Sequence, residues 1–319
     1  MAVFAVGSNG NEVGLIQRAL KDAGLFAGSV DGLFGPQTES AVKVFQAQVG
    51  LQADGKVGPA TWAKLFPTST AQPQVPSGDL TTRCLALTGS FETSRLAPDC
   101  FAGLTGNFDG QGLSFGALQW NFGQGTLQPL LKEMLSDHPE VASSIFGSNL
   151  AALQGAINGS KDAAVAFAVS IQDPAKKVIA NPWRQMFQTL GLTPEFQAIE
   201  VKGAADYYGR GLRLCQAYGL WSERGRALMF DISVQNGSIS DSTKGLILAD
   251  FGKLDPSLSP EQAELAKMRI VANRRAEAAN PKFVEDVRTR KLCIAEGKGT
   301  VHGLVYDLEA QFGLALRKA

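Results

Sequence analysis

Two carboxylates, Glu92 and Asp109, are the residues of this 319-residue chain best placed to do chemistry. Glu92 follows Phe91 at the end of a predicted helix, and Asp109 lies in a glycine-rich segment that predicts a short β-hairpin. Partial burial beside Phe91 would keep one carboxyl protonated, whereas an ionised partner needs a wetter, hydrogen-bonded place. One protonated and one ionised carboxyl across a cleft suit the hydrolysis of a glycosidic bond.

Each of these carboxylates also has a purely structural interpretation. Glu92 could simply end its helix, and Asn-Phe-Asp-Gly at 107–110 is a good turn by itself, so Asp109 could be an ordinary turn residue. Asp99 is an alternative second carboxylate. The second member of the pair therefore stays open.

Composition excludes several other kinds of chemistry and partner. The only histidines are His138 and His302, so a zinc hydrolase with two or three histidine ligands is disfavoured, and we expect no metal and no cofactor. The four cysteines form no CxxC pair, and we expect buried thiols, with a Cys84–Cys100 bridge left open. Lys+Arg and Asp+Glu are both 30, which predicts no nucleic-acid partner. No apolar run reaches the length of a membrane span, so we expect no membrane insertion, and we expect a monomer.

The elements that must position Glu92 are mainly helical. Asp79 can cap a helix whose apolar residues Leu80, Cys84, Leu87 and Phe91 share one face. An irregular β-hairpin is expected within 99–125, where apolar residues alternate from Leu113 onward. Helices are predicted at about 79–92, 126–137, 139–146, 149–157, 162–171, 174–190, 193–201, 203–219, 222–236, 241–252, 260–278 and 281–294. The tail 304–319 is expected to pack back onto its own domain.

A Pro/Ser/Thr/Gln-rich stretch divides the chain. Residues 67–78 read PTSTAQPQVPSG, which is typical of an extended linker. It separates a small unit at 1–66 from a larger one at 79–319. In the small unit, DGLFGPQT at 31–38 recurs as DGKVGPAT at 54–61, and the flanking apolar spacing predicts three helices around one core.

The segment 15–66 closely resembles the peptidoglycan-binding module of bacterial cell-wall hydrolases. The match covers Asp-Gly, Gly-Pro and Thr of both repeated strings. The resemblance implies cell-wall binding, and the candidate contacts are Asp31, Phe34, Gln46, Asp54 and Trp62. Alternatively these residues only build a turn-rich three-helix core.

Three strings of the larger unit resemble the lysozyme superfamily, in particular chitosanases and the muramidase endolysins of phages that infect Gram-negative bacteria. They are LTGSFET at 87–93, DGQGLSFGALQWN at 109–121 and RALMFDISVQNG at 226–237, with a weaker echo at 287–303. The resemblance implies a lysozyme-like helical domain with a small β-hairpin region. It also implies Glu92 as general acid, Asp109 as the base or a water-positioning group, and Ser114 as a hydroxyl that orients the water.

Further residues are candidates for substrate contacts around this pair. Gln119 and Asn121 could hydrogen-bond sugar, and Tyr208 could stack on it or pack in the core. Asp231 and Gln235 share a predicted helix and could support the cleft from behind. Asp231 could also be a buried structural partner of an arginine.

Both units agree on peptidoglycan glycan strands as the partner. We expect a modular endolysin that cleaves the β-1,4 bond between N-acetylmuramic acid and N-acetylglucosamine. The N-terminus lacks the features of a signal peptide, so we expect the protein to wait in the host cytoplasm and to act in the periplasm after holin-type release. The alternatives are a lytic transglycosylase that uses Glu92 alone, a chitosanase or chitinase, and a wall-binding structural protein without catalysis.

Overall fold

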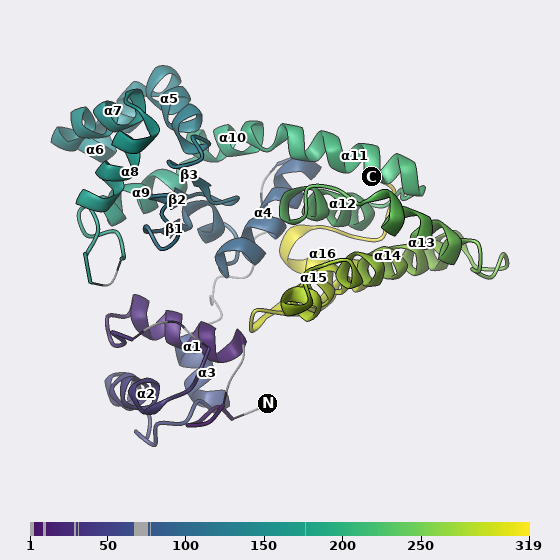
Figure 1. The fold of residues 1–319 in the computed structure, drawn as a ribbon, viewed down its shortest axis with the longest axis horizontal. Coiled ribbons are helices and arrows are strands. Elements are labelled where there is room, and N and C mark those ends of the chain that lie inside the picture. Colours follow the sequence, from purple (N-terminus) through teal and green to yellow (C-terminus); the bar gives the residue numbers. More distant parts are fainter. Residues whose placement is uncertain are drawn as a thin grey trace. The chain divides into compact units, whose positions relative to one another are not determined.

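The computed structural model describes residues 3–8, 11–28, 30, 32–66, 76, 78–175 and 177–319. This part of the chain is mainly helical, as the sequence predicts, and it has two small sheets where one β-hairpin was expected (Figure 1). The chain divides into two compact units near residue 73. The predicted linker 67–78 lies outside the described residues except for Pro76 and Gly78, and Asp31 also lies outside them.

The N-terminal unit holds three helices, α1 (Asn11–Asp22), α2 (Pro36–Gln48) and α3 (Pro59–Leu65). Proline begins α2 and α3, where its missing N–H has no helical partner to lose. The core gathers apolar side chains from all parts of the unit: Val13, Ile16, Leu20, Phe26, Phe34, Ala41, Val42, Phe45 and Val57. Val44 fits the predicted helical spacing, but it lies on the outer face of α2 and is 48% exposed.

The repeated strings are explained by two buried glutamines. Gln17 accepts the Gly32 N–H and donates to the Leu33 carbonyl and Thr38 Oγ1. Gln46 accepts the Gly55 N–H and donates to the Lys56 carbonyl and Thr61 Oγ1. Each glutamine therefore joins its own Asp-Gly turn to the start of the following helix, and the two halves of the unit are built alike.

The larger unit consists of many helices around two short sheets. Its α-helices are α4 (Leu80–Thr93), α5 (Leu127–Asp137), α6 (Pro139–Phe146), α7 (Leu150–Asn158), α8 (Lys161–Ser170), α9 (Trp183–Gly191), α10 (Pro194–Gly203), α11 (Ala205–Tyr218), α12 (Glu223–Gln235), α13 (Asp241–Phe251), α14 (Pro260–Glu277), α15 (Val284–Glu296) and α16 (Leu308–Phe312). The central one is α12, which contacts α4, α11, α14 and α15 and is buried along most of its length.

The glycine-rich segment forms a three-stranded antiparallel sheet. Its strands are β1 (Leu104–Thr105), β2 (Ser114–Phe115) and β3 (Trp120–Asn121), with Thr105 opposite Ser114 and Ser114 opposite Asn121. The sheet lies against α4 at Gly89, where an added Cβ would be 2.7 Å from the Cβ of Ala117. This close approach fixes the end of α4 beside the sheet.

Helix α4 begins as the sequence predicts. Asp79 caps it by accepting the Thr82 N–H at 2.9 Å, and the helix ends at Thr93. The tail also packs back as expected, because Ser222 pairs with Lys318 and Leu314 is fully buried. The sequence did not predict the hairpin of β4 (Lys298–Val301) and β5 (Leu304–Asp307).

The predicted helix at 174–190 is wrong in its first half. Of residues 171–182, those that the structure describes form turns and a bridge between Gln172 and Ile179, and α9 starts only at Trp183. Pro182 explains the late start, because proline lacks an N–H and disfavours helical geometry at the residue before it.

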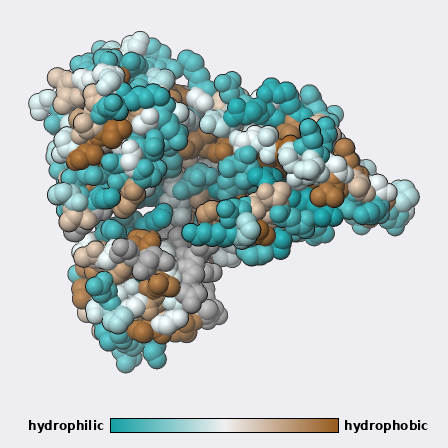
Figure 2. Space-filling view, in the orientation of Figure 1, coloured by the Kyte–Doolittle hydropathy of each residue, from teal (hydrophilic) through white to brown (hydrophobic). Residues whose placement is uncertain are grey.

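The surface is mixed in character. On the face drawn in Figure 2, hydrophobic residues are scattered among hydrophilic ones and form no broad apolar patch. Among the helices of the described residues, none is both long and apolar enough to span a bilayer.

We predict that Gly89→Ala destabilises the larger unit by about 1–3 kcal/mol, because the new methyl group overlaps Ala117 across the interface between α4 and the sheet. Gly155→Ala is the matched control, since Gly155 lies in a helix with open space around it. That variant should gain about 0.5–1 kcal/mol from helix propensity. Urea unfolding of both proteins checks the pair. Equal stability of the two variants would contradict the close packing at Gly89.

Candidate active site

Glu92 lies in the last turn of α4, and its side chain is 28% exposed. Its Oε1 accepts a hydrogen bond from Arg290 Nη2 at 2.8 Å. Phe91 beside it is buried, and the Arg290 guanidinium lies 5.0 Å from the centre of that ring. One face of the Glu92 carboxyl is thus held by a cation while part of the side chain still meets solvent.

Arg290 is itself fixed by Asp231. The carboxylate of Asp231 is fully buried and accepts from Arg290 Nε at 3.0 Å and from Nη2 at 2.6 Å. It also accepts from Lys291 Nζ and from Thr88 Oγ1. Lys291 donates in addition to Gln235 Oε1 at 2.6 Å. Helices α4, α12 and α15 therefore meet at one cluster of four alternating charges, Glu92, Arg290, Asp231 and Lys291.

The cluster is electrostatically balanced. Burial alone would raise the pKa of Asp231, but Arg290 and Lys291 outweigh it and bring the pKa to about 2. Burial lowers the pKa of Lys291 to about 8 against the pull of Asp231, so the ammonium stays charged at neutral pH. Burial would also lower the pKa of Arg290, but Asp231 and Glu92 raise it above its usual range. All the buried members of the cluster are thus ionised at neutral pH.

The sheet contributes a second set of polar groups near the end of α4. An added Cβ at Gly103 would overlap the Thr93 side chain and lie 3.0 Å from Gln119 Nε2, which brings the residue after Glu92 against this sheet. Gln119 donates to the Gly103 and Gly116 carbonyls and accepts from Thr105 Oγ1 at 2.7 Å. Gln119 is therefore beside the Glu92 end of α4, but its amide is engaged in holding the sheet together.

Asp109 lies in the exposed loop between β1 and β2. Its Oδ1 accepts the Gln111 N–H at 3.0 Å, which is the turn geometry that the alternative interpretation expected. Ser114 follows on β2, between Thr105 and Asn121. Asn121 is nearly buried and accepts the Gln124 N–H, so it shapes the loop after β3.

Two predicted substrate contacts are not placed to touch a sugar beside Glu92. Asp231 has no exposed surface, so it supports the site from behind. Tyr208 hydrogen-bonds Thr81 and Arg226, and burial raises its pKa. Thr81 belongs to the first turn of α4, about 16 Å along the helix from Glu92. Tyr208 therefore lies at the other end of α4. Gln235 is half-buried and bonded to Lys291.

Sequence reasoning missed the two cations that define the site. Arg290 and Lys291 fall in the string at 287–303, whose echo of the lysozyme superfamily was weak. The expectation that Asp231 could be the buried partner of an arginine pointed to such a cation. Nothing in the local sequence indicated which arginine it is.

In the N-terminal unit, most candidate wall contacts turn out to build the fold. Phe34 and Gln46 are buried, and Gln46 is fully engaged with the second turn. Trp62 packs on Phe4 and Phe66. Asp54 is exposed, and hydrogen bonds from the Lys56 N–H and from Gln46 lower its pKa.

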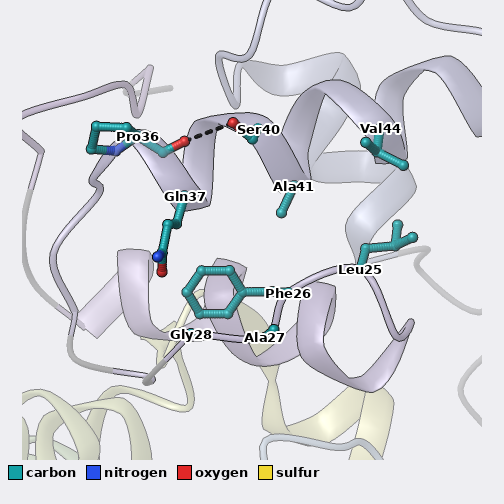
Figure 3. Close-up of a pocket in the computed structure, with 9 residues that line it drawn as sticks. All are labelled: Leu25, Phe26, Ala27, Gly28, Pro36, Gln37, Ser40, Ala41 and Val44. Atoms are coloured by element: carbon teal, nitrogen blue, oxygen red, sulfur yellow. Dashed lines mark hydrogen bonds between the residues drawn. The ribbon is translucent and has the colours of Figure 1, made fainter.

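An open groove of about 460 Å³ lies elsewhere on this unit, between the segment after α1 and the outer face of α2. Figure 3 shows Phe26 and Gln37 facing each other across it, with Ser40 bonded to the Pro36 carbonyl. The remaining lining residues are Leu25, Ala27, Gly28, Ala41 and Val44, so among the described residues no charged side chain lines the groove.

The described residues contain no group of three or more His, Cys, Asp or Glu side chains arranged to hold a metal ion. All four cysteines are buried free thiols.

We predict that Asp231→Asn lowers the free energy of unfolding by about 3–5 kcal/mol at pH 7, because it leaves Lys291 buried without its counter-charge and Arg290 paired with Glu92 alone. Glu285→Gln is the matched control, since it removes an exposed ion pair with Arg288 on the same helix. That control should change stability by less than about 0.5 kcal/mol. Denaturant unfolding measures both variants, and a small effect at Asp231 would contradict the coupling of the cluster.

We also predict that the stability difference between wild type and Asp231→Asn depends on pH. The pKa of Asp231 is about 2 in the folded chain against 3.8 for an ordinary aspartate. The stabilisation it gives is present above pH 4 and is lost as the pH falls towards 2, an effect of about 2 kcal/mol. The stability difference between wild type and Asp231→Asn should therefore shrink as the pH falls from 5 to 2. A constant difference would show that Asp231 does not titrate as proposed.

Comparison with known proteins gives a clear result for the N-terminal unit. Residues 9–65 match the family model described as "Putative peptidoglycan binding domain". This segment is 44% identical over 57 residues to N-acetylmuramoyl-L-alanine amidase CwlM of Mycobacterium tuberculosis, and the match covers 18% of this chain and 14% of that protein. It is 53% identical over 38 residues to zinc D-Ala-D-Ala carboxypeptidase of Streptomyces albus G, covering 12% of this chain and 15% of that one. The chain thus matches only a small part of each relative and carries an N-terminal peptidoglycan-binding domain.

The larger unit is similar to chitosanases of known structure, at low identity. A complex of chitosanase OU01 with substrate gives a TM-score of 0.44 at 17% identity, covering 71% of this chain and 94% of that one. The native chitosanase of Bacillus subtilis MY002 gives a TM-score of 0.43 at 16% identity, covering 69% of this chain and 89% of that one. A likeness at this level assigns neither a substrate nor a catalytic residue to this chain.

Proposed function

We propose that this protein is a peptidoglycan glycosidase that cleaves the β-1,4 bond between N-acetylmuramic acid and N-acetylglucosamine. The observation that carries the proposal is a partly exposed glutamate, held by a buried ion-pair cluster, in the same chain as a peptidoglycan-binding domain. The domain would tether the enzyme to its polymer and raise the local concentration of glycan.

Glu92 is proposed as the general acid. Because Arg290 occupies Oε1, a proton carried by this carboxyl resides on Oε2, which fixes the direction from which it can be delivered to the leaving oxygen. Asp231 holds the guanidinium in place through two of its nitrogen atoms. The cluster therefore orients the acid, while the chemistry itself belongs to Glu92.

Asp109 is proposed to position the attacking water, with help from Ser114. The bond from the Gln111 N–H to Oδ1 fixes the plane of the carboxylate and leaves Oδ2 to accept from water. The separation of the two carboxyls during reaction would decide the stereochemistry, with about 6.5–9.5 Å giving inversion and about 5–5.5 Å giving retention.

A lytic transglycosylase is the second candidate. It would cleave the same bond with Glu92 alone, and the observation that favours it is the ordinary turn role of Asp109 in an exposed loop. In that case Asp109 would be dispensable and the product would carry an anhydro-muramic end.

The wall contact is proposed to lie in the groove of Figure 3. Its lining is uncharged and combines apolar surface with the Gln37 amide and the Ser40 hydroxyl, which suits a polymer of acetylated sugars bearing alanine-rich peptides. The motif residues Phe34 and Gln46 are buried and cannot serve the same purpose.

We predict that Glu92→Gln lowers the release of soluble fragments from purified sacculi by at least about 100-fold, because the amide cannot donate a proton to the leaving oxygen. Borohydride-reduced products analysed by mass spectrometry give the measurement. Glu285→Gln is the control, since it removes an exposed carboxylate that belongs to no candidate site, and it should keep full activity. Full activity of Glu92→Gln would refute the assignment.

Asp109→Asn separates the two candidate reactions in the same assay. A strong loss of reduced muramic ends supports hydrolysis with a positioned water. Unchanged activity with anhydro-muramic ends supports the transglycosylase and removes the role of Asp109.

We predict that Val44→Glu weakens binding of the full chain to sacculi by about tenfold, because it places a charge in an uncharged groove. Val6→Glu introduces the same charge at another exposed valine outside the groove and should bind as wild type does. Co-sedimentation with sacculi, in a Glu92→Gln background to prevent digestion, compares the two. Equal binding of both variants would place the wall contact elsewhere.

A further inference from the structure

A second pocket, of about 380 Å³, lies in the larger unit away from the Glu92 carboxyl. It is lined by the start of α12, the end of α15, the β4–β5 hairpin, the first turn of α16 and the tail after it. Arg224 lines it seven residues before Asp231 on α12, and Gly297 lines it seven residues after Arg290. The pocket is therefore about 10 Å along both helices from the charge cluster that holds Glu92.

Most charges around the pocket neutralise one another. Lys298 Nζ is 3.0 Å from Asp307 Oδ2, and Glu296 binds Arg269 through two hydrogen bonds of 2.6 and 2.7 Å. Within the part of the chain that the structure describes, Arg224 and Glu309 have no ion pair or side-chain hydrogen bond. One cation and one anion thus remain for a ligand.

Arg224 is the unusual member of this pair. Its side chain is only 9% exposed, and its Nε is buried without a hydrogen-bond partner. Burial lowers the pKa of the guanidinium, and the nearby carboxylates of Glu296, Glu309 and Glu264 raise it in part. The Nε–H therefore lacks the hydrogen bond that a buried donor usually makes, and a carboxylate in the pocket would supply it.

The backbone leaves room for this guanidinium. Gly297 ends α15 with φ +75°, and an added Cβ there would overlap Arg224 Nη1. The glycine at this position allows both the helix ending and the close approach of the arginine. The guanidinium is therefore held against the pocket wall before any ligand binds.

We infer that this pocket binds a group that carries a carboxylate and an ammonium on the same carbon, with Arg224 taking the carboxylate and Glu309 the ammonium. Arginine suits the first role because its planar fork matches two carboxylate oxygens. Glu309 lies in the exposed first turn of α16 and can pair with a cation that enters from solvent. The other charged residues of the pocket, Glu296, Lys298 and Asp307, already have ion-pair partners.

In peptidoglycan, the free end of a diaminopimelate residue in the peptide stem has this chemistry. The identification of the source rests on the proposed function, because a protein that digests peptidoglycan meets such stems on the strands that it cleaves. On this basis the larger unit binds the peptide stem as well as the glycan strand. Stems that lack the zwitterionic end would then bind less well.

The test is isothermal titration calorimetry of the full chain with meso-diaminopimelate, with pimelate as a probe that has both carboxylates but no ammonium. We expect saturable binding of diaminopimelate and at least about tenfold weaker binding of pimelate. Arg224→Gln should weaken diaminopimelate binding by at least about tenfold, and Arg224→Lys by less. Glu309→Gln should weaken diaminopimelate and leave pimelate unchanged.

Glu285→Gln serves as the control, since it removes an exposed carboxylate of α15 outside the pocket and should bind as wild type does. Circular dichroism and thermal unfolding show whether Arg224→Gln is folded, and the exposed Glu309 supplies an independent variant if it is not. No binding by wild type, or equal binding by the Glu309→Gln protein, would overturn the inference. Equal affinity for pimelate would also overturn it, by reducing the site to one for simple anions.

Digestion of sacculi by the same preparations separates this inference from the proposed function. Product release without diaminopimelate binding would overturn the pocket assignment alone. Diaminopimelate binding that depends on Arg224 without any product would support the pocket and reject the glycosidase.

Discussion

Arg290 and Lys291 are two adjacent cations buried in the centre of a helical unit, and the buried carboxylate of Asp231 pairs with both of them. Each charge loses its hydration on burial, and the loss is recovered only with well-formed hydrogen bonds on every side. The carboxylate of Asp231 on α12 accepts hydrogen bonds from both cations. It also accepts one from the Thr88 hydroxyl of α4. The packing of α4, α12 and α15 must therefore keep these groups within hydrogen-bond distance.

This packing constraint explains how the end of α4 can hold Glu92 in a fixed orientation in the candidate site. The last turn of a helix frays easily, and Glu92 stands one residue before the end of α4. Arg290 fixes the Glu92 side chain from inside, and the contacts of Gly89 with Ala117 and of Thr93 with Gly103 fix the backbone from the sheet. An apolar replacement for the cluster could be as stable, but it would leave Glu92 free to rotate. The charges are thus better understood as devices for orientation than as sources of stability.

The sequence predicted those parts of the fold that depend on local rules. The cap at Asp79, the helix that follows it and the small sheet at 104–121 came from spacing and turn chemistry. The late start of α9 follows from Pro182, a local signal against a helix that runs from 174 to 190. Glu92 could be named because it lies in a recognisable string. Arg290, which pairs with Glu92, could not be named from the sequence. It lies 59 residues from Asp231 and on another helix than Glu92, so the pairing depends on how three helices pack.

In the N-terminal unit, the residues that define the repeated motif build the fold. Gln17 and Gln46 occupy equivalent places in two turns, and the Gly and Thr residues of the repeated strings are their hydrogen-bond partners. Phe34 is part of the core that these turns close. These residues recur within the module because the turn geometry requires them, which is a sufficient reason without any ligand. The wall contact that we propose uses positions that the turn geometry leaves unconstrained, such as Gln37, Ser40 and Val44 on the outer face of α2. A motif can therefore identify a binding domain by the residues that fold it, while the residues that bind lie outside the motif.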